Sequence, residues 1–218
     1  MGSNGKTRFS EIAQGELTTM KSGLTLPTKA LVRTASKEFD KDESPIEDAL
    51  KELFNQYPGN SDLRHVLLKV VALNSLYSTQ ITAHSAKLPN VVDVAQHICR
   101  NAKKIDSALA AGSPEIVETI AWVSVSNKKD RNNFSFATKY CSWHNPEAYP
   151  IYDSNVQRYF EHLQKQIAFS GGFNVSAAHW TYAEFRGAMN DIRERYDLGA
   201  FTFKEIDKFL WLYGGNLA

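Results

Sequence analysis

Residues 181–215, TYAEFRGAMNDIRERYDLGAFTFKEIDKFLWLYGG, contain the same helix-start signal twice. Thr181 with Glu184, and Thr202 with Glu205, have the spacing of a capping box, in which a hydroxyl and a carboxylate bond the free amides of the first helical turn. Apolar residues recur at helical spacing after each box, and two glycines end the stretch. The stretch therefore predicts two consecutive helices.

Helical patterns also fill most of the chain upstream of this stretch. The segment 44–57 has Ser44 as its N-cap and Pro45 at the first helical position, where proline is favoured. The segment 61–81 is apolar on nearly every side, which predicts a central, buried helix. Further helices are predicted over residues 90–112, 113–125, 134–144 and 154–169.

These patterns predict an all-α protein of about eight helices. Alternating strand patterns are almost absent, and there are no internal repeats. Residues 1–27 are polar and rich in Gly, Ser and Thr, so we expect an N-terminal arm with local order only. Residues 28–218 are expected to form the helical domain, as one compact body or as two lobes with a cleft between them.

The composition narrows the class of protein. The 218 residues are 43% apolar and 22% charged, with a formal net charge of +1, so any DNA binding depends on local basic patches. The two cysteines form no metal-binding or disulfide pattern, so we expect a reducing cytoplasm, no metal and no cofactor. No segment has the length of a membrane span. We expect a monomer without membrane contact.

The stretch YPIYDSNVQRYF, residues 149–160, raises a question of function. Pro150 favours an extended approach, after which a helix begins near Asp153. Asp153 or Ser154 caps that helix in the simplest interpretation, since both residue types are favoured N-caps. If Ser154 serves the first-turn amides, the Asp153 carboxylate is left free at the positive end of the helix dipole.

This stretch resembles the segment of helix-hairpin-helix DNA glycosylases in which an extended approach leads to a catalytic aspartate and then to a helix with an arginine. The resemblance implies that Asp153 is the catalytic carboxylate and that Asn155 and Arg158 lie at the DNA or the base. The segments 134–144 and 205–214 resemble the second helix of the hairpin module and the closing helix of that family. The similarity covers roughly residues 62–215.

The hairpin itself departs from the family's pattern. Its usual glycines are replaced by SNKKDRNNFS, residues 126–135. Phosphate binding is then expected from a basic, amide-rich set of side chains, which comprises Lys128, Lys129, Arg131, Asn132 and Asn133. Residues 127–144 carry a net charge of +3. The alternative is an ordinary solvated loop.

A second departure concerns strand cleavage. Family members that also cut the strand carry a lysine near the start of the hairpin's second helix, and the corresponding place in this chain is Ser135. Lys139 lies one turn further on and is kept as a second catalytic candidate. We therefore predict a monofunctional enzyme that removes a base without a dedicated lyase lysine.

Two further groups of side chains are candidates for contacts with DNA or the base. The polar end of the 61–81 segment is either a solvated helix end or a wedge that fills the gap left by an extruded nucleotide. Its residues are Asn74, Ser75, Tyr77, Ser78, Thr79 and Gln80. The aromatic side chains near Asp153 are expected either to pack in the core or to stack on the base. They are Tyr140, Trp143, His144, Tyr149 and Tyr152.

The sequence thus predicts a DNA glycosylase acting on a modified or damaged base that is flipped out of double-stranded DNA. Repair of oxidised or alkylated bases and defence against phages with modified DNA are both open as its setting. The alternative is a non-catalytic helical module that binds DNA or protein, because such a module has the same helical periodicity and the same basic loop.

Overall fold

The computed structural model of the chain describes residues 23–82, 84–174 and 180–217 and is mostly helical. Its helices are α1 (Lys29–Gln56), α2 (Leu63–Leu76), α3 (Val91–Arg100), α4 (Ala102–Ala111), α5 (Ile116–Ala121), α6 (Phe134–His144), α7 (Ser154–Ile167), α8 (Tyr182–Arg195) and α9 (Phe203–Gly214). Two short strands, β1 (Trp122–Val123) and β2 (Arg131–Asn132), pair antiparallel. The predicted all-α fold class is confirmed.

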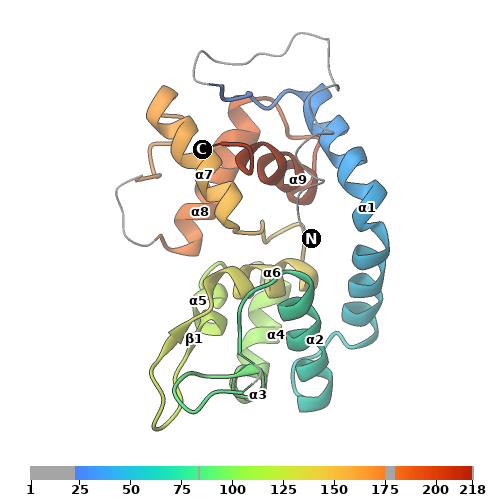
Figure 1. Ribbon diagram of the computed structural model, residues 1–218, viewed down its shortest axis with the longest axis vertical. Coiled ribbons are helices and arrows are strands. Elements are labelled where there is room, and N and C mark those ends of the chain that lie inside the picture. The colour runs from blue at the N-terminus through green and yellow to red at the C-terminus, as the bar shows by residue number, and fades with distance from the viewer. Residues whose placement is uncertain (1–22, 83, 175–179, 218) are drawn as a thin grey trace.

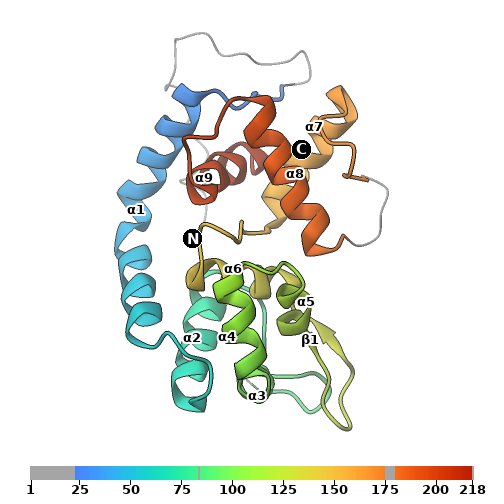
Figure 2. The same cartoon turned by 180° about the vertical axis from the view of Figure 1, so that it is seen from behind.

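The helices form two groups that are connected along one side by α1. In Figure 1, α7, α8 and α9 lie together above, and α2 to α6 lie together below. The view from behind in Figure 2 shows the same division, with α1 running alongside both groups. Helix α1 packs against α9 in the one group and against α2 and α6 in the other. The two groups also meet directly, since Arg186 of α8 donates to the Gly112 carbonyl at 2.7 Å.

Both predicted capping boxes are confirmed. The Thr181 hydroxyl accepts from the Glu184 amide at 3.2 Å, and Thr202 accepts from the Glu205 amide at the same distance. Each glutamate carboxylate in turn accepts from the amide of its threonine. The apolar faces that follow are buried, so α8 and α9 begin where the sequence predicts.

The start predicted for the first helix is wrong. Helix α1 begins at Lys29, with Thr28 as its N-cap, and Pro45 lies inside it. Proline in a helix interior removes one backbone hydrogen bond, and packing of the flanking turns can offset that cost. Leu31 and Val32 before it and Leu50 and Phe54 after it are all buried in one core.

Two other predicted helices are shorter than expected. The segment 90–112 is divided at Asn101, whose amide side chain donates to the His97 carbonyl at 2.9 Å and so ends α3. The segment 113–125 is helical only over α5, because Trp122 pairs with Asn132 across the small sheet. The Asn133 amide also donates to the Ala121 carbonyl at 2.9 Å, which closes the hairpin.

Helix α2 is not the fully buried element that its composition predicts. Val66, Val70 and Leu73 are buried in the core, whereas Leu68 and Val71 are 52% and 46% exposed. Helix α2 therefore has two apolar faces, and among the described residues only one of them is covered.

Part of the predicted N-terminal arm is described. Residues 1–22 lie outside the described residues, but Leu24 is fully buried and the Thr25 carbonyl accepts from the Tyr159 hydroxyl at 2.7 Å. The chain is thus anchored to α7 before α1 begins. Among the described residues, no helix combines the length and the apolar character that crossing a membrane requires.

Candidate active site

A cavity of about 520 Å³ lies where α1, the end of α2, α6, the approach to α7 and α9 come together. It is lined by Glu38, Phe39, Ile46, Glu47, Leu76, Tyr77, Ser78, Lys139, Ile151, Asp153, Lys204, Asp207, Lys208, Trp211 and Leu212. Both catalytic candidates from the sequence, Asp153 and Lys139, are among these residues.

Asp153 serves as a helix cap and as a cavity residue at once. Its backbone is extended, as the preceding Pro150 predicts, and its Oδ1 accepts from the Asn155 amide at 2.9 Å. Its Oδ2 lies 3.6 Å from the Lys139 ammonium, and 26% of the side chain is exposed. The expectation that Ser154 frees the aspartate from capping is wrong, because Ser154 is the first residue of α7. One carboxylate oxygen caps the helix, and the other is paired with Lys139 at the cavity.

Lys139 lies on the cavity side of α6 and is buried, with 3% of its side chain exposed. Its Nζ donates to Ser135 Oγ at 2.7 Å and to the Tyr152 carbonyl at 3.1 Å. It also lies 5.6 Å from the centre of the Tyr77 ring. Burial lowers the pKa of Lys139, and the neighbouring Asp153 carboxylate opposes that effect.

Ser135, the residue that the sequence resemblance aligns with a lyase lysine, is a hydrogen-bond partner of Lys139. A spacing of four residues puts the two side chains on the same face of α6, one turn apart. A lysine one turn further along therefore reaches the neighbourhood of Asp153.

Asp207 is a cavity residue that no sequence pattern predicted. It lies on α9, on the face that also carries Lys204, Lys208 and Trp211. Burial raises the pKa of Asp207 to about 7, and the ammonium of Lys139 opposes this rise. The sequence signal for Asp207 was its position between Lys204 and Lys208 on one helix face, and many solvated helices have the same pattern.

The other charges at the cavity are mostly paired. Lys204 contacts Glu47 at 3.2 Å, and Lys208 contacts the same carboxylate at 3.1 Å. Lys208 also bonds Asp40. Helices α1 and α9 are therefore connected by an ion-pair network beside the cavity.

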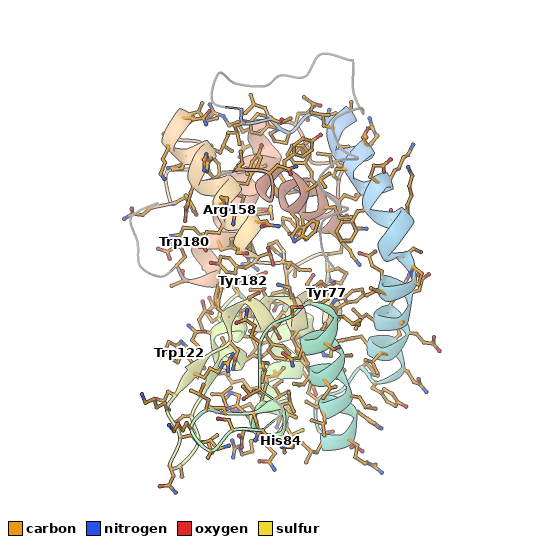
Figure 3. The ribbon with its side chains drawn as sticks, viewed as in Figure 1. Tyr77, His84, Trp122, Arg158, Trp180 and Tyr182 are labelled. Carbon is orange, nitrogen blue, oxygen red and sulfur yellow. The ribbon has the colours of Figure 1, made fainter. Side chains whose placement is uncertain are left out.

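Only part of the polar end of α2 reaches the cavity. Tyr77 and Ser78 line it, and Figure 3 shows Tyr77 at the end of α2 nearest α9. Asn74 instead holds the turn, since its amide donates to the Ile81 carbonyl at 2.9 Å and accepts from the Ile81 amide at 2.8 Å. Ser75 and Gln80 are exposed, and Thr79 donates to Asn74 at 2.9 Å.

Most of the predicted stacking rings lie in the core. Tyr140 and Tyr149 are fully buried and do not line the cavity. Tyr152 supplies its backbone carbonyl to Lys139, and Trp143 lies behind Tyr77, to whose hydroxyl it donates at 3.2 Å. The aromatic residues that do line the cavity are Phe39, Tyr77 and Trp211.

His144 belongs to a separate buried cluster. Its Nε2 lies 3.2 Å from Nζ of Lys69, which also donates to Asn60 at 3.0 Å. Burial and the nearby ammonium lower the pKa of His144 to about 3, and burial lowers the pKa of Lys69 to about 8. His144 is therefore a neutral partner of Lys69 and has no contact with the cavity.

The basic hairpin is less open than its sequence predicts. Lys128 forms an ion pair with Asp93, and Arg131 donates to the Gln80 carbonyl at 2.6 Å. Asn133 is buried, and its side chain has no hydrogen-bond partner among the described residues. Lys129 and Asn132 are exposed. Lys139, which contributed to the net charge of +3, lies in the cavity and not in the hairpin.

Two predicted DNA contacts, Asn155 and Arg158, connect α7 to α9. Arg158 donates to the Gly214 carbonyl at 3.0 Å and to Asn155 at 3.3 Å. Figure 3 shows Arg158 on α7, within the group formed by α7, α8 and α9. These two side chains fix the angle at which α7 presents Asp153.

Comparison with known proteins gives a family but no described activity. The family model HI_0787_N, described as an N-terminal domain, matches residues 31–148. An uncharacterized protein from Haemophilus influenzae is 36% identical over 144 residues, which are 66% of this chain and 63% of that protein. The match thus spans less than two thirds of that relative's length. No solved structure matches the chain.

Proposed function

The chain belongs to the HI_0787_N family, and we propose that it is a DNA N-glycosylase acting on a modified or damaged base. The observation that carries the proposal is the Asp153 carboxylate, which lines a cavity of about 520 Å³ and whose Oδ2 is paired with a buried lysine. Ligand pockets of this size hold small organic molecules, which supports entry of an extruded nucleoside. Lys139 lies inside the family match, and Asp153 follows it.

The carboxylate suits the chemistry of this reaction. Cleavage of an N-glycosidic bond builds positive charge on the deoxyribose, as in the hydrolysis of other sugars. Asp153 Oδ2 would stabilise that charge and accept a proton from the attacking water. Its second oxygen is held by the Asn155 amide, so the carboxylate is oriented before any substrate arrives.

In this proposal Lys139 holds Asp153 in position and does not attack the sugar. Its Nζ is surrounded by three oxygens, from Ser135, Tyr152 and Asp153. Three acceptors match the three N–H groups of an ammonium, which has no lone pair for attack. The proposed activity is therefore monofunctional.

The target carbon is hidden inside duplex DNA, so the nucleotide has to turn out into the cavity. The proposed cleft is the junction between the α7–α9 group and the α2–α6 group, where the cavity lies. Tyr77 and Ser78 line it at the end of α2 and are the candidates to fill the gap in the stack. Lys129 and Asn132, exposed on the hairpin, are the candidates for phosphate contacts.

A second candidate activity is strand cleavage through a Schiff base. It is favoured by one observation, that burial lowers the pKa of Lys139 beside Asp153 and so favours a neutral amine. DNA repair and phage defence both fit the proposed activity. The two cysteines, Cys99 and Cys141, are free, which fits the proposed cytoplasmic location.

The test is a panel of duplexes with oxidised, alkylated or enlarged bases, together with phage genomes that carry modified bases. Each is incubated with the protein and divided, and one half is heated in alkali to reveal abasic sites. Strand breaks only after alkali support the monofunctional glycosylase, and breaks before it support the lyase. Tight, salt-sensitive binding without release of any base would instead support a non-catalytic module.

A further inference from the structure

The Asp207 carboxyl group is the feature of the cavity that the mechanism above does not use. Its Oδ1 has no access to solvent and accepts no hydrogen bond from any residue that the structure describes. The side chain lines the cavity on α9, between Lys204 one turn before it and Trp211 one turn after it. A buried polar atom without a partner is costly, so its retention at a cavity indicates a partner that comes from outside.

The groups that face Asp207 come from every element around it. Lys139 of α6 and Asp153 before α7 interact with it most strongly, with opposite signs. Lys204 and Lys208 of α9 are its other cations, and both are paired with Glu47 of α1. Two further carboxylates of α1 belong to this surrounding: Glu38 lines the cavity and bonds Lys41, and Asp40 bonds Lys208.

The nearby lysines do not keep Asp207 ionised. Burial is the largest effect on its pKa and brings the value to about 7. At neutral pH a large fraction of Asp207 therefore holds its proton, in the same cavity in which Asp153 is a carboxylate cap. Two carboxyl groups in one site, of which one holds its proton, suit an acid and a base role.

The position of Asp207 suggests which partner it meets. Asp153 has to lie beside the anomeric carbon, so the base extends from that carbon toward the rest of the cavity. The wall formed by α1 and α9 carries Phe39 and Trp211, whose rings lie edge to face at 5.7 Å, and Asp207 is part of the same wall. A nucleobase placed there has an aromatic surface and a carboxyl group within reach.

We propose that Asp207 is the general acid of the reaction and donates its proton to the departing base. This inference rests on the proposed glycosylase function. As the bond between C1′ and the base nitrogen breaks, its electron pair moves to the base, and the Asp207 proton neutralises the charge. A water oxygen then bonds to C1′ and loses a proton to Asp153. Exchange of protons with solvent restores both carboxyl groups, so the net reaction is hydrolysis.

The experiment measures single-turnover release of the base between pH 5.5 and 9 with wild type, Asp207→Asn and Asp207→Glu. For wild type we expect the rate to fall about tenfold per pH unit above the pKa of the acid. Asp207→Asn still donates a hydrogen bond but cannot transfer a proton, so we expect a loss of about 10²–10⁴-fold below pH 7 and no alkaline fall. Asp207→Glu should recover part of the rate together with the alkaline fall.

Duplex affinity and the melting temperature of the free protein separate this role from a structural one. We expect both to be unchanged in Asp207→Asn, because asparagine has nearly the shape of aspartate and the buried Oδ1 accepts no hydrogen bond from any described residue. If Asp207→Asn does not fold, the dependence of the wild-type rate on pH tests the acid role alone. A wild-type rate of base release that is constant from pH 6 to 9 overturns the inference.

The failure of this inference is distinguishable from the failure of the proposed function. Asp207→Asn with the wild-type rate and profile, while Asp153→Asn is inactive, overturns the acid role alone. Wild-type protein that releases no base from any duplex overturns both.

Discussion

Lys139 Nζ lies 3.6 Å from Asp153 Oδ2, although the two residues belong to different helices. The extended segment between α6 and α7 returns to α6, where the Tyr152 carbonyl accepts from Lys139 at 3.1 Å and the Tyr152 amide donates to Thr138 at 3.1 Å. The start of α7 is thereby joined to the middle of α6 at the Asp153 carboxylate.

Replacement of Lys139 by glutamine tests whether it positions the carboxylate or attacks the sugar. We expect Lys139→Gln to slow base release about tenfold, equivalent to about 1.4 kcal/mol, because Asp153 loses its cation. Borohydride reduction during turnover should trap no covalent protein–DNA adduct with wild type. An adduct that forms with wild type and is lost in Lys139→Gln would establish Lys139 as a nucleophile. Lys204→Gln, which removes another lysine of the cavity, is the control for a general effect of charge.

Gly214 of α9 lies against the backbone of α7 at Asn155. A Cβ at this position would lie 2.0 Å from the Asn155 carbonyl oxygen, which is backbone and cannot turn away. We expect Gly214→Ala to lower the free energy of unfolding by about 1–3 kcal/mol, and to reduce base release because α7 carries Asp153.

Gly187 provides a matched control for this substitution. It lies inside α8 with nothing within 4 Å of an added Cβ, so Gly187→Ala should stabilise the protein by about 1 kcal/mol. Urea unfolding of both variants measures the difference. Equal stability of the two variants would contradict the packing described for α7 and α9.

The hairpin lysines offer a matched pair for DNA binding. Lys129 is exposed and forms no ion pair with any described residue, whereas Lys128 is paired with Asp93. We expect Lys129→Ala to reduce by about one the slope of log affinity against log salt, as loss of one phosphate contact does. Lys128→Ala should change this slope less, because Lys128 is already paired with Asp93. Titrations of a labelled duplex at several salt concentrations check this, and identical slopes for both variants would argue against a phosphate contact at Lys129.

The sequence predicted correctly those helix starts that depend on side chains close together in the chain. The capping boxes at Thr181 and Thr202, and the extended approach through Pro150 to a helix at Asp153, depend on side chains a few positions apart. The start of α1 could not be found in this way. Ser44-Pro45 is a good local start signal, but a continuous helix buries residues on both sides of Pro45.

The cavity was predicted only in part, for the same physical reason. Asp153 and Lys139 were identified because they are close in sequence to each other and to the motif. Asp207 joins them only through the packing of α9 against α1 and α7, and no local spacing encodes that contact. His144, close to the motif in sequence, is instead directed to Lys69 by the position of α2.

The most direct test of the account compares wild type with Asp153→Asn for release of free base, measured by mass spectrometry on a duplex that wild type cleaves. Asparagine is as good an N-cap as aspartate, so α7 should remain capped, and melting temperature and duplex affinity should stay near wild type. Asp62→Asn, which changes the cap of α2 outside the cavity, controls for capping. The account predicts no base release from Asp153→Asn and full release from Asp62→Asn. Release at the wild-type rate by Asp153→Asn would contradict it.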